Sequence, residues 1–170
     1  MTDRIPEQIA AMAAMEARAP VQDYQYPPKP LARLDADVRV TYTGVCATDV
    51  HMIDDDWGLS RYPLVPGHEV VGHVIAVGEG VSHLAVGDVV GLGAQAQACG
   101  RCEQCEAGID NLCPERKFTY FENTVDETGE HVHHGGFSAY LRTDSRYLFK
   151  VPAGYGWAFA TARGTLRIGV

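Results

Sequence analysis

Short runs of β-branched residues, alternating with polar residues or broken by glycine, dominate the middle of the chain. In the segment 38–43, Val38, Val40 and Tyr42 are separated by polar residues, and this period of two predicts a strand with one buried face. The segments 70–78 and 86–91 are β-branched runs interrupted by glycine, which suits tight corners and bulges. Many short strands with glycine turns predict a mainly β barrel or sandwich rather than a doubly wound α/β sheet.

Residues 1–23 are predicted to form an N-terminal extension. Residues 5–18 are rich in Ala, Met and Glu, and Ile5, Ile9 and Met12 occur at helical spacing, so we expect a short amphipathic helix there. Prolines follow at positions 20, 27, 28 and 30. Because proline fixes φ and disfavours helix at the preceding residue, the segment 20–30 is expected to be an extended linker or edge segment.

Length, composition and charge limit the classes of function. A chain of 170 residues, 46% of them hydrophobic, is expected to hold one domain with appendages. Its formal charge is -8 and its basic residues are scattered, so we expect no nucleic-acid partner. No secretion signal is evident, and no stretch approaches the roughly 20 apolar residues that span a bilayer. We therefore expect a soluble, cytoplasmic protein without a membrane partner, whose five cysteines stay reduced and serve metal binding or catalysis.

Four of these cysteines are clustered between residues 99 and 113. Cys99, Cys102 and Cys105 are separated by two residues each, and Cys113 follows after seven more. Tetrahedral zinc needs four soft ligands at about 2.3 Å, and two-residue spacers let successive backbone turns direct sulfur to one point. The spacing predicts a structural zinc site, closed on all four sides, which stabilises a loop and performs no chemistry.

Two alternatives to zinc compete for the same cysteines. A bacterial ferredoxin motif also has two-residue spacings and ends in Cys-Pro, as Cys113-Pro114 does, but its last gap is three residues and it usually occurs as a pair. Disulfides are disfavoured by the reducing compartment that we expect. The longer gap and the single copy favour zinc over an iron–sulfur cluster.

A second group of metal-ligand residues lies near the predicted strands. Taken alone, Cys46 is explained by a small buried side chain and His68 by a hydrogen-bonded turn. A catalytic zinc, however, takes three protein ligands and leaves one position open, and a Cys2His set is one known version. Beside the four-cysteine cluster, Cys46 and His68 are candidates for two of those three ligands.

The chain resembles the zinc-dependent medium-chain alcohol dehydrogenases, and its Trp57-Gly58 and 62–69 segments are similar to the cinnamyl alcohol dehydrogenase branch. The resemblance covers residues 24–154 and implies a GroES-like, partly open β-barrel with a zinc-binding loop lobe and short helices. The motifs that carry it are Cys46-x-Thr48-Asp49-x-His51, Gly67-His68-Glu69, the four-cysteine cluster and Gly135-Gly136-Phe137-Ser138.

The resemblance also implies roles for individual residues. It makes Cys46 and His68 ligands of a catalytic zinc, places Glu69 beside the metal in exchange with water, and makes Asp49 the carboxylate that orients the zinc-bound histidine. Thr48 matches the hydroxyl that takes the alcohol proton, and His51 matches the outer end of the proton relay. In the family, zinc polarises the oxygen of a small alcohol or aldehyde while hydride moves to or from NAD(P).

Trp57 has two explanations. Under the resemblance it lines an apolar pocket for aromatic or medium-sized aldehydes. Composition alone explains it equally well as a core tryptophan.

Family features are missing from the last part of the chain. The resemblance puts the third zinc ligand, a cysteine, near Thr165, yet no cysteine follows Cys113, and residues 155–170 form a divergent tail. We expect that the Rossmann domain is absent through truncation and that this chain alone is inactive. The alternative is a zinc-binding β-barrel module without catalytic function.

Two further motifs are interpreted as without function. Gly91-x-Gly93-x-x-Ala96 matches a dinucleotide-binding pattern, but the cysteine cluster follows it instead of a helix that could hold pyrophosphate. The histidines at 131, 133 and 134 are better explained by a polar loop than by a metal site, since no cysteine or carboxylate cluster surrounds them.

Overall fold

The computed structural model describes residues 4–120, 134–152, 157–160 and 166–169. Strands make up most of its regular structure, so the mainly β prediction is confirmed. In chain order the elements are β1 (Ile9–Ala13), β2 (Gln22–Tyr26), β3 (Asp35–Thr43), α1 (Ala47–Asp54), β4 (Val70–Val77), β5 (Val89–Leu92), β6 (Gln95–Gln97), α2 (Glu103–Glu106), the 3-10 helix η1 (Asp110–Leu112), β7 (Lys117–Phe118), β8 (Tyr140–Asp144), the 3-10 helix η3 (Ser145–Tyr147), β9 (Leu148–Lys150), β10 (Trp157–Ala160) and β11 (Leu166–Gly169).

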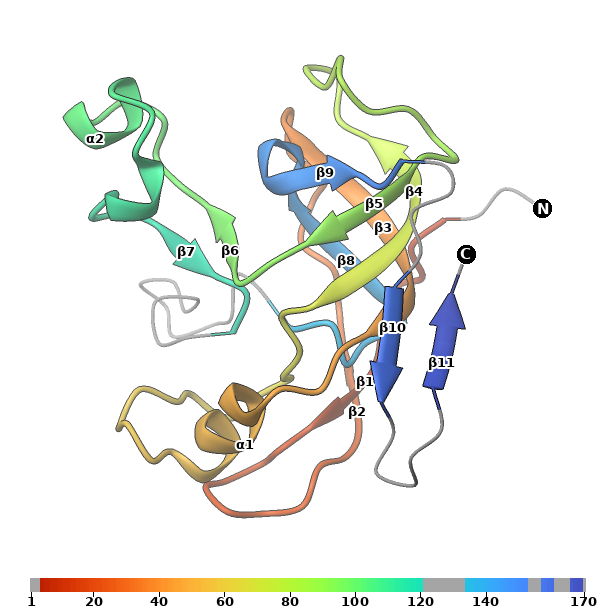
Figure 1. Cartoon of the computed structure of the whole chain (residues 1–170), viewed down its shortest axis with the longest axis vertical. Helices are drawn as coiled ribbons and strands as arrows, with labels where there is room; N and C mark the ends of the chain where they lie inside the picture. The colour runs from red at the N-terminus through yellow and green to blue at the C-terminus, as the bar shows by residue number, and fades with distance from the viewer. Residues whose placement is uncertain (1–3, 121–133, 153–156, 161–165, 170) are drawn as a thin grey trace.

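The centre of the fold is a five-stranded sheet in the order β8-β3-β4-β5-β9 (Figure 1). All of its strand pairs are antiparallel. A doubly wound parallel sheet is therefore not part of the described residues. The sheet encloses the main core, whose buried members are Ala36, Val38, Val70, Val74, Leu84, Val90, Leu92, Leu141 and Leu148.

A bulge alters the alternation expected for the strand at 38–43. Val38 is buried and Val40 packs at the margin of the core, but the side chain of Tyr42 is 55% exposed. The pairing of β3 with β4 shifts register between Val40 and Tyr42. An extra residue in one strand reverses the face to which the following side chains point, so Tyr42 lies outside the core.

The prediction of a helix within residues 1–23 is wrong. The segment Ile9–Ala13 is strand β1, paired antiparallel with β2. Every second residue is buried, starting with Ile9, and Tyr26 and Val65 pack against this face. The other edge of β1 binds the chain near Phe137, whose carbonyl accepts a hydrogen bond from Met12 at 2.8 Å. Burial and two-sided pairing thus outweigh the helix propensity of the alanines, which is a weak bias in so short a segment.

A small lobe projects from one side of the sheet (Figure 1). It contains the two-stranded sheet β6-β7 together with α2 and η1. Because the segment after Gly91 and Gly93 is strand β6 and not a helix, it lacks the helix N-terminus that a dinucleotide site requires. Farther along the chain, β10 and β11 pair as an antiparallel hairpin.

No described helix combines the length and the apolar character needed to cross a membrane.

Candidate functional site

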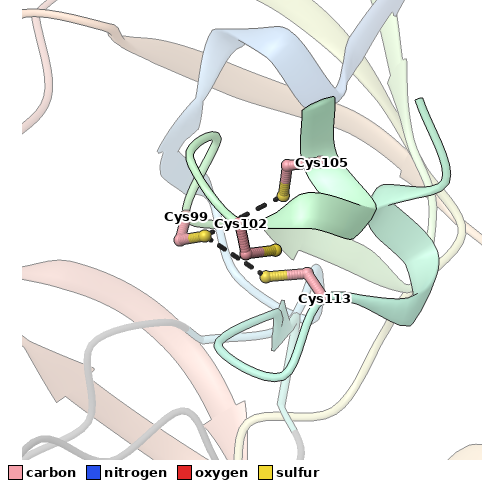
Figure 2. A group of neighbouring side chains, drawn as sticks. All are labelled: Cys99, Cys102, Cys105 and Cys113. Atoms are coloured by element: carbon pink, nitrogen blue, oxygen red, sulfur yellow. Dashed lines mark hydrogen bonds between the residues drawn. The ribbon is translucent and has the colours of Figure 1, made fainter. Parts of the chain in front are cut away.

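The four clustered cysteines converge in the lobe (Figure 2). One ligand atom from each, Sγ of Cys99, Cys102, Cys105 and Cys113, lies within 4.8 Å of all the others. Four sulfurs bound tetrahedrally to one zinc at about 2.3 Å would lie about 3.8 Å apart. The Cys99 sulfur is 3.9 Å from that of Cys105 and 3.6 Å from that of Cys113. The sulfur spacing therefore fits a closed zinc site.

Local structure explains how the chain brings these sulfurs together. Cys102 precedes the first residue of α2, Cys105 lies within that helix, and Cys113 follows η1 directly. The backbone N–H of Arg101 donates towards Cys99 and lowers the pKa of its thiol to about 7, whereas desolvation raises the pKa of Cys105 to about 12. A divalent cation would compensate the charge of the deprotonated sulfurs.

The second candidate site lies at one edge of the main sheet. Antiparallel pairing brings the end of β3 next to the start of β4, where Thr43 is opposite Val70. Just beyond this edge, the N–H of Gly44 donates to the carbonyl of Glu69 at 2.8 Å. One ligand atom each from Cys46, His68 and Glu69 then lies within 4.8 Å of the other two. The structure thus brings together the three residues predicted to bind a catalytic zinc.

Helix α1 positions Cys46 through its own N-terminus. Cys46 is the N-cap residue, and its backbone N–H donates to Oδ2 of Asp49 at 2.8 Å. In a capping box, the N-cap backbone N–H donates to the side chain of the third helical residue, as Cys46 does to Asp49 here. This contact fixes the first turn of the helix. The motif from Cys46 to His51 is therefore also the start signal of a helix.

Asp49 connects this helix to the loop that carries His68. The Asp49 side chain is buried, and its Oδ1 accepts a hydrogen bond from the N–H of Gly67 at 2.9 Å. Nδ1 of His68 lies 3.2 Å from the same oxygen. A carboxylate in this position favours the tautomer with the proton on Nδ1, which leaves Nε2 as the metal-binding atom.

Tyr120 is a member of this site that sequence reasoning did not identify. Its side chain is fully buried, and its hydroxyl donates to Oδ1 of Asp49 at 2.7 Å. The Tyr120 hydroxyl oxygen also lies 2.6 Å from Nδ1 of His68. Burial, followed by the hydrogen bond to Asp49, raises the pKa of Tyr120 well above its usual value, so the hydroxyl stays protonated. No local signal marks this tyrosine, because it lies 71 residues from Asp49 in the sequence.

The predicted relay residues lie on α1. The hydroxyl of Thr48 is 3.6 Å from the Cys46 sulfur. Nδ1 of His51 is 2.7 Å from a carboxylate oxygen of Asp56, and its ring centroid is 5.1 Å from that of Trp57. Among the residues that the structure describes, no hydrogen bond joins Thr48 to His51. The two side chains nevertheless share a helix face, because they are three residues apart.

The Gly135-Gly136-Phe137-Ser138 motif supports the loop with His68. N–H groups of Gly135, Gly136 and Phe137 donate to the carbonyls of residues 65, 67 and 66 at 2.8 to 2.9 Å. A Cβ atom at Gly135 would lie 2.1 Å from the carbonyl oxygen of Pro66. This position therefore requires glycine, since any side chain would push the loop away from the sheet.

A cavity of about 610 Å³ opens beside His68 and Glu69. Its walls include apolar side chains on β5 and near β9, among them Leu92, Phe149 and Val151. Trp57 does not belong to the described residues that line it, and its side chain is 48% exposed. The structure thus places Trp57 beside His51 and outside the lining of this cavity.

Two predictions concern residues outside the described ranges. Thr165, where the family pattern places a third ligand, lies outside them, as do the histidines at positions 131 and 133. His134 is described: its ring centroid lies 3.8 Å from that of Tyr26, and it belongs to neither group of possible metal ligands found among the described residues.

Comparisons with known proteins agree with this geometry. Residues 33–153 match the model of the alcohol dehydrogenase GroES-like domain. The chain is 42% identical over 152 residues to aldehyde reductase AdhA of Synechocystis sp., a match that covers 89% of this chain and 42% of AdhA. It therefore spans less than half the length of this relative.

Solved structures of cinnamyl alcohol dehydrogenases have the same fold. The enzyme from Sorghum bicolor superposes with a TM-score of 0.79 at 36% identity, covering 86% of this chain and 41% of that one. The Helicobacter pylori enzyme, solved with NADP(H), gives a TM-score of 0.80 at 27% identity, covering 88% and 43%. The antiparallel sheet, the lobe and the order of the motifs agree with these matches: the chain belongs to the alcohol dehydrogenase GroES-like domain family and is similar to its cinnamyl alcohol dehydrogenase branch.

Proposed function

We propose that this chain is the metal-binding catalytic part of a zinc-dependent NAD(P) alcohol dehydrogenase acting on small alcohols or aldehydes. The observation that carries the proposal is the convergence of Cys46, His68 and Glu69 within 4.8 Å. Three protein ligands with one position open are typical of catalytic zinc, unlike the closed set of four sulfurs in the lobe. Similarity to AdhA and to the cinnamyl alcohol dehydrogenases supports this class of reaction.

The two sites would hold zinc for different purposes. Cys99, Cys102, Cys105 and Cys113 would hold a structural ion that stabilises a lobe with few buried apolar side chains. Cys46, His68 and Glu69 would hold the catalytic ion. When bound, zinc supplies Lewis acidity towards a substrate oxygen, and the nicotinamide supplies or accepts hydride.

The chain's own residues would handle the proton. Thr48 lies next to Cys46 on the first turn of α1 and would take the proton of the alcohol. His51 is exposed, contacts Asp56 through Nδ1, and would release that proton to solvent. Because no hydrogen bond joins Thr48 to His51 among the described residues, the relay requires a bridging hydroxyl or water between them.

Trp57 would form an apolar wall at the outer side of the same site. Its ring lies against that of His51 at a centroid distance of 5.1 Å. An aromatic side chain that is half exposed beside a proton relay is suited to contact an aromatic or medium-sized aldehyde. The five free cysteines fit a reducing compartment, which supports a cytoplasmic location.

We further propose that these 170 residues bind zinc but do not turn over substrate alone. The described residues contain no strand, glycine loop and helix in the arrangement that binds a dinucleotide. A zinc-binding module without catalysis is the alternative, and one observation favours it: no cysteine follows Cys113 in this sequence to act as the second thiolate of a Cys2His set.

Cobalt replacement distinguishes the two. Wild-type protein and Cys46→Ser, both with zinc kept in the lobe, are loaded with Co²⁺ and titrated with benzyl alcohol. We expect the alcohol to shift the visible Co²⁺ spectrum of the wild type, because one coordination position is open, and to have no effect on Cys46→Ser. An unchanged wild-type spectrum would support the module without catalysis. Benzaldehyde reduction by this chain with NADPH would contradict its inactivity.

A further inference from the structure

We propose that Tyr120 is a positioning residue that holds His68 in the tautomer and orientation needed to bind a metal. The inference rests on the proposed metal site at Cys46, His68 and Glu69. It assigns to Tyr120 an effect on metal affinity, although this tyrosine is not itself a ligand.

The position of the Tyr120 hydroxyl is the first observation. It lies 2.7 Å from Oδ1 of Asp49 and 2.6 Å from Nδ1 of His68. Both distances are those of direct hydrogen bonds. The phenol ring packs in a cluster with Met52 and Leu64, and only 1% of the residue is exposed. The hydroxyl is therefore held in place between the two polar side chains.

Counting protons gives the direction of each hydrogen bond. The Tyr120 hydroxyl donates its single proton to Oδ1 of Asp49, at 2.7 Å. The Tyr120 oxygen is then left with lone pairs facing Nδ1 of His68, and this contact is favourable only if Nδ1 carries the proton. With that proton on Nδ1, Nε2 has a free lone pair. Nε2 is consequently the atom available to a metal shared with Cys46 and Glu69.

Asp49 alone orients His68 less firmly. Its Oδ1 is 3.2 Å from Nδ1 of His68 and also accepts from the N–H of Gly67. The shorter contact is the one with Tyr120. Two acceptors on the same nitrogen restrict rotation of the imidazole ring more than one does, which is how groups behind a ligand tune metal sites.

The position of Tyr120 comes from the lobe. The residue follows β7, and its neighbour Thr119 is fixed to the corner after β5: the Thr119 hydroxyl lies 3.0 Å from the carbonyl oxygens of Gly93 and Ala94. Since β5 ends at the same edge of the sheet where β4 begins, with Leu92 opposite Val70, this corner directs Tyr120 towards His68.

The test uses Tyr120→Phe, with Tyr62→Phe as its matched control. Tyr62 belongs to the same apolar cluster, but its hydroxyl donates to the carbonyl of Ile53 at 2.8 Å, at the far end of α1. Each variant thus loses one hydroxyl from one cluster. Only Tyr120→Phe removes a contact to His68.

Two readouts are measured on protein with zinc in the lobe. Co²⁺ titration, followed by the absorption of the Cys46 thiolate–Co²⁺ bond, gives the affinity of the second site. Long-range ¹H–¹⁵N correlation spectra, recorded before cobalt is added, give the tautomer of His68. For Tyr120→Phe we expect affinity to fall by about 10- to 100-fold, as for other groups behind a metal ligand, with a larger share of the Nε2–H tautomer. Tyr62→Phe should leave both unchanged.

If Tyr120→Phe keeps the cobalt affinity and the His68 tautomer of the wild type, the inference is overturned. It is also overturned if Tyr62→Phe loses as much cobalt affinity as Tyr120→Phe does. If Tyr120→Phe does not fold, the wild-type spectrum still decides, because an Nε2–H tautomer of His68 would contradict the proposal. Failure of the proposed function gives a different result. In that case wild-type protein shows no thiolate–Co²⁺ band. The tautomer of His68 can still be measured, and it still tests whether Tyr120 holds the proton on Nδ1.

Discussion

Gly44 shows how a single hydrogen atom in place of a side chain shapes the candidate catalytic site. A Cβ atom at this position would lie 2.0 Å from Oε2 of Glu69 and 2.9 Å from its Cβ. Distances this short are not tolerated, so the Glu69 side chain would have to move. The close approach of this carboxylate to Cys46 and His68 thus depends on glycine.

We predict that Gly44→Ala lowers the affinity for metal at Cys46, His68 and Glu69 by roughly 10- to 100-fold, the range found when support of a metal ligand is lost. Gly93→Ala is the matched control, because Gly93 lines the same cavity and a Cβ there would meet no atom within 4 Å. Cobalt titration of both variants measures the effect. Equal affinities in the two would show that Glu69 does not depend on the space at Gly44.

At the scale of single residues, sequence motifs predicted most of the candidate site. Cys46 and His68 were candidates from their residue types beside the four-cysteine cluster, and the resemblance to the dehydrogenase family implied the roles of Asp49 and Glu69. Tyr120 could not be found in this way. It reaches Asp49 only through the pairing of strands and the corner at Gly93 and Ala94, which no local pattern encodes.

At the scale of elements, a buried ion pair joins β3 to β8. Arg142 donates to both carboxylate oxygens of Asp37, at 2.7 and 2.8 Å. The side chains are 15% and 5% exposed. Removing one partner of such a pair leaves an uncompensated buried charge, which costs about 3–5 kcal/mol.

We therefore predict that Arg142→Met lowers the free energy of unfolding by about 3–5 kcal/mol. Arg101→Met is the control: Arg101 also contacts a carboxylate, that of Glu115, but these side chains are 74% and 54% exposed. Exposed pairs contribute roughly 0–1 kcal/mol. Urea denaturation of both variants tests the difference, and similar losses would mean that the Asp37 pair is effectively solvated.

The expected elements were most accurate where β-branched residues are frequent. The strands predicted at 38–43, 70–78 and 86–91 correspond to β3, β4 and β5. The prediction of an N-terminal helix was wrong. Ile5, Ile9 and Met12 have helical spacing, but the alanines between them are small enough to pack in a strand as well as in a helix, and the segment forms β1. One of its two partners, the chain near Phe137, is distant in sequence.

At the scale of the whole molecule, the fold brings two groups of metal ligands onto one β scaffold with different surroundings. The lobe encloses four sulfurs that are nearly tetrahedral in spacing. The sheet edge holds three mixed ligands beside an open cavity. The order of the motifs predicted this division, since the same motifs that resemble the dehydrogenase family also form the two clusters.

The most direct test of this account is zinc analysis combined with X-ray absorption at the zinc edge, on wild-type protein and Cys46→Ser prepared without chelators. We predict two zinc ions per wild-type chain, and one in Cys46→Ser surrounded by four sulfurs at about 2.3 Å. Wild-type protein without zinc, or a single zinc bound mainly by nitrogen and oxygen, would contradict the account.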